Sequence, residues 1–264
     1  MNLVVKYGGS VLATDARAPA QGDESNGIAE SVVDAVAGHS GNVVLVHGGG
    51  PHLSDALARA RIATTFIGGL RSTPEEAMQI VLATMRDLNA GIAAQLERRG
   101  RRAVATSGVG GLFACSRAWG SGGEDLGRVG RVTQVNGARI HSWWRSRCTP
   151  VVAPIGTLED GKPCNVNADD VAGAIAGALR APAIFVTDVD GVILDGRVRE
   201  MLSLDEVAQA QRDGKINGGM TPKTDACVKA VRLGAPFARI VPAGPNILRP
   251  NAGTRIAEAQ ARVP

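Results

Sequence analysis

Short apolar segments that alternate with helical patterns constrain the fold of this chain more than any other feature of its sequence. Each segment is rich in Val, Ile, Leu or Ala and is apolar at consecutive positions. Strands of this kind are buried on both faces, which is typical of a parallel sheet covered by helices. The alternation of strand and helix predicts an α/β protein, a three-layer αβα sandwich. The predicted strands are residues 3–7, 42–47, 103–107, 150–154, 183–187 and 238–242.

Helix start signals lie between these strands. Thr73, Pro74 and Glu76 form the pattern of a capping box with proline in the first helical position. Ser203 and Glu206 form a second capping box. Together with the apolar periodicity, these signals predict helices over residues 74–99, 171–179, 204–212 and 221–233.

Composition bounds the class of protein. The chain has 264 residues, 44% of them hydrophobic, which is enough for one large domain or two lobes with a full core. Only 3% are aromatic, which argues against a stacking platform for single-stranded nucleic acid. The net charge of +4 suits an anionic substrate such as ATP, or an acidic protein partner.

Several sequence features bear on location. The four cysteines show no CxxC spacing, so we expect reduced thiols. No apolar segment reaches the roughly 20 residues that span a membrane, and the first predicted strand follows Met1 directly, without a signal peptide. We therefore expect a cytoplasmic protein that binds neither membrane nor nucleic acid.

Two predicted strands run directly into glycine clusters. Lys6 ends the first strand region shortly before Gly8 and Gly9, and the second strand is followed by Gly48 and Gly49. Loops without side chains let backbone N–H groups approach an anion closely. The pair of clusters predicts a phosphoryl group held between two loops; tight turns at the strand ends are the alternative.

A third glycine cluster precedes a helix. Gly218, Gly219 and Met220 are followed by a Thr-Pro helix start that places Lys223 in the first helical turn. A lysine is unfavourable there, because the helix N-terminus is already positive. A bound polyanion reverses that preference, so we interpret Lys223 as a phosphate contact rather than a solvated lysine.

Two polar segments are candidates for the remaining site residues. Asp188 follows the strand 183–187, at the edge of a parallel sheet where ligands bind. Asn165 and Asp169 belong to an Asn/Asp cluster that precedes the helix 171–179. That cluster is either part of the site or simply a helix cap.

These motifs together resemble the amino acid kinase family, and within it the N-acetyl-L-glutamate kinases. The resemblance covers nearly the whole chain, from Val4 to about Ile256, with the motifs in the family's order. It implies an open, mainly parallel central sheet and transfer of the ATP γ-phosphoryl group to a side-chain carboxylate, as in arginine biosynthesis. It also implies an N-terminal lobe for the acceptor (residues 1–181), a C-terminal lobe for ATP (residues 182–264) and a homodimer.

The resemblance assigns roles to the phosphate-binding residues. Lys6 and Lys223 would stabilise the charge on the transferring group, and Asp169 would hold both lysines in position. The N–H groups of Gly8, Gly9, Gly48 and Gly49 would contact the phosphoryl group and the attacking carboxylate.

The resemblance also assigns the substrate contacts. Arg71, in the sequence Gly-Leu-Arg-Ser-Thr, would clamp the α-carboxylate of the acceptor with help from Asn165. Asp188 and residues 218–220 would line the nucleotide site. Mg²⁺ would be carried by the ATP phosphates, without direct protein ligands.

The chain departs from the family pattern at some positions. Gly110 replaces an aspartate, Ala90 stands where many relatives have lysine, and residues 243–245 replace Asp-Gly-Arg. Two alternatives therefore remain. One is a kinase whose glutamate or aminoadipate acceptor is blocked by an acidic carrier protein; the other is a non-catalytic, nucleotide-binding regulator. The carrier alternative predicts a basic face beside the acceptor mouth, formed by Arg128, Arg131, Arg139 and Arg145.

Overall fold

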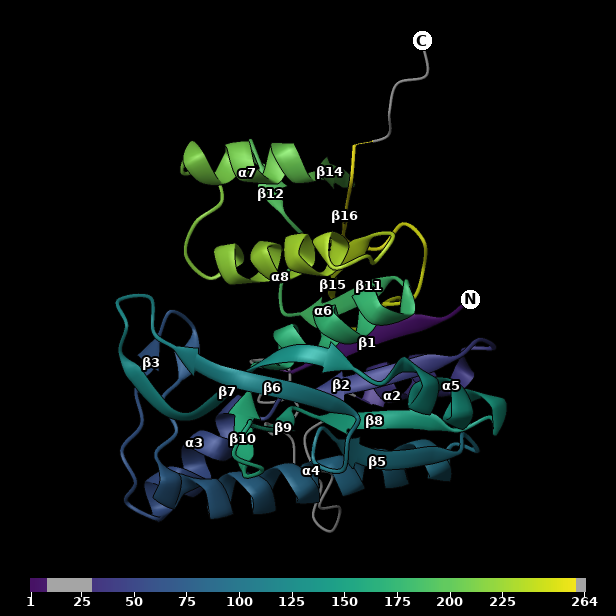
Figure 1. The fold of residues 1–264 in the computed structure, drawn as a ribbon. Coiled ribbons are helices and arrows are strands. Elements are labelled where there is room, and N and C mark those ends of the chain that lie inside the picture. The colour runs from purple at the N-terminus through teal and green to yellow at the C-terminus, as the bar shows by residue number, and fades with distance from the viewer. Residues whose placement is uncertain (9–29, 260–264) are drawn as a thin grey trace.

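A computed structural model describes residues 1–8 and 30–259 of the chain. Its centre is an eight-stranded sheet between two layers of helices (Figure 1). From one edge to the other, the strands are β14 (Met201–Ser203), β16 (Thr254–Ala257), β15 (Ala238–Pro242), β11 (Ala183–Thr187), β1 (Leu3–Tyr7), β2 (Val43–His47), β8 (Thr149–Ala153) and β5 (Ala103–Ser107).

The six strands predicted from the sequence are consecutive neighbours in this sheet. Strands β15, β11, β1, β2, β8 and β5 all pair in parallel. Four of the predicted ranges agree with the structure, and β2 and β8 differ from theirs by one residue. The open, mainly parallel αβα sandwich is confirmed. The sequence did not predict β14 and β16, and β16 runs antiparallel to β15.

Alternation along β1 divides the interior into two cores. Leu3, Val5 and Tyr7 pack on one face of the sheet, and Val4 packs on the other. Lys6 shares the face of Val4, because side chains alternate along a strand. The first face is covered by α2 (Glu30–Gly38) and α4 (Met78–Arg98). The face of Lys6 is covered by α5 (Gly137–Arg145), α6 (Ala168–Leu179), α7 (Leu204–Arg212) and α8 (Met220–Arg232) (Figure 1).

A second, smaller sheet lies against the Lys6 face. Its order is β6 (Phe113–Trp119), β7 (Asp125–Val135), β10 (Pro163–Val166) and β9 (Ile155–Thr157). Short hairpins are formed by β3 (Phe66–Ile67) with β4 (Leu70–Arg71), and by β12 (Ile193–Leu194) with β13 (Arg197–Val198). The helix α3 (Gly50–Arg59) follows β2 directly.

The predicted helix starts have different outcomes. The capping box of Ser203 and Glu206 is present at the start of α7. The capping box predicted at Thr73 is wrong: a 3₁₀ turn, η2 (Glu75–Ala77), precedes α4, and its N-cap Pro74 makes no side-chain bond. Thr73 is fully buried, and its hydroxyl donates instead to the main-chain oxygen of Arg71.

The main sheet is continuous between the two predicted lobes, since β1 pairs with β11. The assignment of acceptor binding to residues 1–181 and of ATP binding to residues 182–264 stays a prediction. Within the described ranges, no helix has the length and apolar character to cross a membrane.

Candidate active site at the edge of the sheet

The ion pair between Lys6 and Asp169 lies at the centre of the site. The Lys6 Nζ is 2.8 Å from Asp169 Oδ1, and the two side chains are 15% and 27% exposed. Lys6 comes from β1 and Asp169 from the first turn of α6, so the sheet and the helix layer above it meet at this pair. Asp169 was predicted to hold both lysines: its pairing with Lys6 is present, whereas among the described residues the ion pair of Lys223 is with Asp188.

The start of α6 serves both as a helix cap and as part of the site. Asn167 is the N-cap, and its side-chain oxygen accepts hydrogen bonds from the main-chain N–H groups of Asp169 (2.7 Å) and Asp170 (3.3 Å). This cap fixes the first turn, which carries Asp169 toward Lys6. The two interpretations of the Asn/Asp cluster are therefore compatible.

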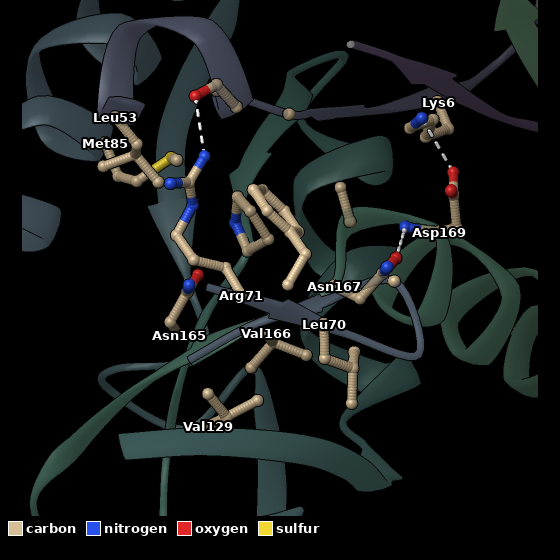
Figure 2. A pocket seen from close by; sticks show the side chains of 17 residues that line it. Lys6, Leu53, Leu70, Arg71, Met85, Val129, Asn165, Val166, Asn167 and Asp169 are labelled. Atoms are coloured by element: carbon tan, nitrogen blue, oxygen red, sulfur yellow. Dashed lines mark hydrogen bonds and ion pairs between the residues drawn. The ribbon is translucent and has the colours of Figure 1, made fainter. Parts of the chain in front are cut away.

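A cavity beside this pair, here named the Arg71 cavity, extends beneath the β3–β4 hairpin. Arg71 lies toward one end of it and the Lys6–Asp169 pair lies at the other (Figure 2). Its walls combine glycines, apolar side chains and a few polar groups. The lining residues are Lys6, Gly48, Gly49, Gly50, Leu53, Phe66, Gly69, Leu70, Arg71, Met85, Val129, Pro154, Asn165, Val166, Asn167, Ala168 and Asp169.

Arg71 is a buried cation with uncharged hydrogen-bond partners. Its guanidinium donates to the hydroxyls of Thr64 (3.0 Å) and Ser54 (2.7 Å) and to the main-chain oxygen of Gly50 (3.0 Å). It also lies over the ring of Phe66, 4.5 Å from the centroid. Burial lowers the pKa of Arg71 from its ordinary value. A carboxylate in the cavity would offset that desolvation, because guanidinium and carboxylate form strong, planar pairs.

A second cavity, here named the Lys223 cavity, lies on the other side of the pair. Lys223 lies in the first turn of α8, as predicted, and its Nζ is 3.8 Å from Asp188 Oδ1 and 3.3 Å from the Gly219 oxygen. Its lining brings two lysines and two glycines together with Asp169 and Thr187, and the lysines and glycine main chain suit a polyphosphate. The lining residues are Lys6, Gly8, Asp169, Phe185, Val186, Thr187, Gly219, Pro222, Lys223 and Ile240.

Lys6 and Asp169 line both cavities. A ligand in the Arg71 cavity and a ligand in the Lys223 cavity would therefore meet at the same ammonium group. This is the geometry required for transfer of an anionic group between two bound molecules.

Main-chain contact makes glycine necessary at Gly8, whereas at Gly49 a Cβ would first meet the flexible end of the Met85 side chain. A Cβ on Gly8 would lie 2.8 Å from the main-chain nitrogen and Cα of Gly48, because the two glycine loops run against each other. A Cβ on Gly49 would lie 2.4 Å from the Met85 methyl group. The two glycine loops therefore lie side by side at Gly8 and Gly48, and the phosphoryl group predicted between them stays a prediction.

His47 supports the second glycine loop from within the core. It is fully buried at the end of β2, and its Nδ1 lies 2.7 Å from the main-chain oxygen of Gly48, to which it donates. Burial lowers the pKa of His47 to about 4. A neutral imidazole therefore holds the Gly48 peptide at neutral pH.

The other residues predicted for the site differ in whether they line one of the two cavities. Asn165 lines the Arg71 cavity, and Gly219 lines the Lys223 cavity. Gly218 and Met220 adjoin the Lys223 cavity without being among its lining residues, and Met220 packs against the core. Gly9 lies outside the described residues.

Sequence reasoning missed the apolar walls of the Arg71 cavity. Leu53, Phe66 and Met85 come from α3, β3 and α4, which are separate in the sequence. The sequence did contain a signal for Phe66, because the Gly68-Gly69 pair that follows it is typical of a two-residue hairpin turn. In the structure both glycines have positive φ and connect β3 to β4.

Of the four arginines predicted to form a basic face for a carrier protein, Arg131, Arg139 and Arg145 are exposed and Arg128 is buried, and the basic face stays a prediction. Arg128 is buried, and it pairs with Asp160 at 2.5 Å and donates to the main-chain oxygen of Pro163. Arg139 lies on α5 and donates to the main-chain oxygen of Gly110.

Comparison with known proteins agrees with this geometry. The sequence model of the amino acid kinase family matches residues 1–241. The chain belongs to that family. It is 39% identical over 251 residues to an acetylglutamate kinase of Thermus thermophilus, covering 94% of this chain and 93% of that protein. An acetylglutamate kinase of Methanopyrus kandleri is 38% identical, with 88% and 91% covered.

A solved structure has the same fold. The protein smu.665 from Streptococcus mutans UA159 superimposes with a TM-score of 0.77 at 26% sequence identity, covering 98% of this chain and 99% of that one. Membership of the amino acid kinase family makes ATP the expected phosphoryl donor and a carboxylate-type oxygen the expected acceptor.

Among residues 1–8 and 30–259, no group of three or more His, Cys, Asp or Glu side chains could hold a metal ion.

Proposed function

We propose that this protein is an ATP-dependent kinase that phosphorylates the side-chain carboxylate of N-acetyl-L-glutamate. The observation that carries the proposal is the Lys6–Asp169 pair, which lines both the Arg71 cavity and the Lys223 cavity. The choice of acceptor is supported by the acetylglutamate kinases that are 36–41% identical to this chain over most of its length.

The Arg71 cavity is the proposed acceptor site. Arg71 would bind the α-carboxylate of N-acetyl-L-glutamate, and Asn165 would contact the same end of the molecule. The apolar walls at Leu53 and Met85 would exclude water. The side-chain carboxylate would then reach toward Lys6 and the N–H groups of the two glycine loops.

The Lys223 cavity is the proposed site of the ATP phosphates. Lys223 and Lys6 would contact the phosphates from two sides, and Gly8 and Gly219 would permit close approach of the main chain. Asp188, whose carboxylate faces Lys223, would position that lysine at the same site. Asp169 would hold Lys6 in a fixed orientation. Mg²⁺ bound to the phosphates would neutralise part of their charge.

The reaction needs positioning and charge stabilisation rather than a base. A carboxylate oxygen of the acceptor attacks the γ-phosphorus, the bond from that phosphorus to the β–γ bridging oxygen breaks, and ADP leaves. The acceptor is already ionised at pH 7, so no proton is removed. Such a loose transition state spreads charge over the phosphoryl oxygens, which Lys6 and Lys223 would stabilise. The product is an acyl phosphate.

Three broader features belong to the proposal. Resemblance to the family supports a homodimer, which light scattering coupled to gel filtration would test. It also supports the use of Mg²⁺, which chelation of the metal in the assay would test. A cytoplasmic location agrees with a biosynthetic role and is tested by cell fractionation.

The direct test is formation of an acyl hydroxamate from N-acetyl-L-glutamate, ATP, Mg²⁺ and hydroxylamine. Free L-glutamate is the matched acceptor control, because it lacks only the acetyl group. Product from the acetylated acceptor alone supports the proposal. ATP binding without product would refute it and would favour a carrier-blocked acceptor or a regulatory role.

A further inference from the structure

Thr73 is a buried residue at the Arg71 cavity to which the proposed mechanism gives no role. It has no exposed surface, and it lies two residues after Arg71. Its hydroxyl donates to the main-chain oxygen of Arg71 at 2.9 Å and accepts from Nδ2 of Asn165 at 3.1 Å. One hydroxyl therefore connects the two residues proposed to bind the acceptor.

The chemistry of these groups fixes the direction of each hydrogen bond. A carbonyl oxygen can only accept, so the single hydroxyl proton of Thr73 must lie in its bond to Arg71. Toward Asn165, the hydroxyl oxygen is then an acceptor, and only the NH₂ end of the amide can face it. The Oδ1 atom of Asn165 has no hydrogen-bond partner within the described residues. That oxygen and the second NH₂ hydrogen are left for a ligand.

The main chain of Thr73 is held independently of its hydroxyl. Its N–H donates to the oxygen of Leu126 at 2.8 Å, and its oxygen accepts from the N–H of Arg128 at 2.6 Å. Between these two bonds, Gly127 adopts a φ of +70°, and a Cβ there would lie 2.4 Å from the Thr73 oxygen. Removal of the hydroxyl alone therefore leaves the connection between this segment and β7 in place.

We propose that Thr73 is a positioning residue for the acceptor: its hydroxyl, oriented by its bond to the main-chain oxygen of Arg71, fixes the amide orientation of Asn165. This inference rests on the proposed function, because it assigns the acceptor to the Arg71 cavity. Without the hydroxyl, Asn165 can turn its amide, and it binds the acceptor in the correct orientation only part of the time. The nucleotide site is unaffected, because neither Thr73 nor its partners Arg71 and Asn165 line the Lys223 cavity.

The test compares T73V, which removes the hydroxyl at nearly constant volume, with T73S, which keeps it. We expect T73V to raise KM for N-acetyl-L-glutamate about tenfold, since an unsatisfied buried polar group is a large perturbation. The KM for ATP stays within about twofold of the wild type, and T73S restores acceptor binding. T149V is the matched control: Thr149 is also buried and its hydroxyl accepts from Arg101 at 2.7 Å, but Arg101 lines neither cavity, whereas both partners of Thr73 line the Arg71 cavity.

A double-mutant cycle with Asn165 shows whether Thr73 acts through that residue. If it does, the T73V/N165A double variant has the same acceptor KM as N165A alone. Additive effects, an unchanged KM in T73V, or equal losses in T73V and T73S would overturn the inference. Loss of ATP binding or folding in T73V would also overturn it, by showing a general structural role. An inactive wild-type protein would instead count against the proposed function.

Discussion

We expect replacement of Asp169 by asparagine to disturb the position of Lys6 without weakening the binding of ATP. The substitution keeps the shape of the side chain and removes its charge. At the observed 2.8 Å, the attraction between Lys6 and Asp169 is about 6 kcal/mol at an effective dielectric constant of about 20. Desolvation of the two partly buried side chains offsets much of this attraction.

The net value of such a charge-assisted hydrogen bond is about 1.5–3 kcal/mol. If Lys6 is held for the transition state, loss of that bond lowers kcat about 10- to 100-fold. The KM for ATP does not rise, because removal of a carboxylate from the Lys223 cavity lessens repulsion of the phosphates. The measurement is steady-state kinetics of the hydroxamate assay with each substrate varied in turn.

The neighbouring residue provides a matched control. Asp170 also lies in the first turn of α6 and forms an ion pair, 2.6 Å from Lys229 Nζ, but it lines neither cavity. We expect D170N to lower stability by about 1 kcal/mol or less and to leave kcat unchanged. A wild-type kcat in folded D169N, or an equal loss in D170N, would refute the role assigned to Asp169.

Three further predictions concern the nucleotide site, the glycine loops and the core. K223A should lower kcat/KM for ATP about 100-fold by removing a phosphate contact, whereas K229A on the same helix should retain it, as measured by initial rates. G8A should lose nearly all turnover, because its Cβ would meet the Gly48 main chain at 2.8 Å, which can be checked with the same assay. For His47, the pKa of about 4 lies below the ordinary 6.5, so the unfolded state binds the proton first and stability falls as pH drops from 6.5 toward 4. His47 should therefore contribute about 2 kcal/mol less to the free energy of unfolding at pH 5 than at pH 7, as measured by denaturant unfolding.

Matched variants define what would contradict these predictions. G38A is the control for G8A, because a Cβ on Gly38 meets nothing within 4 Å, and equal losses in both would contradict the steric argument. Full ATP turnover in K223A would show that Lys223 is not a phosphate contact. For the pH effect, H47N should flatten the stability profile between pH 5 and 7, whereas H141N, at an exposed position, should not. A profile unchanged in H47N would contradict the linkage to His47.

The sequence by itself determined the elements that depend on local chemistry. The strands around Lys6 were readable because consecutive apolar residues indicate burial on both faces. The capping box at Ser203 was readable because its partners lie three residues apart. The glycine loops could be predicted because glycine clusters directly follow apolar strands. Lys223 could be predicted because a lysine is unfavourable near a helix N-terminus.

Only the tertiary structure decided which distant groups meet. Asp169 lies near Lys6 because α6 packs over β1, and no local spacing encodes that contact. Thr73 shows the same limit: its sequence context predicts a helix cap, yet burial against β7 and β10 directs its hydroxyl to Arg71 and Asn165. Local patterns set the secondary structure, whereas the packing of elements far apart in the chain decides which hydrogen-bond partners are available in the core, where an unpaired polar group is costly.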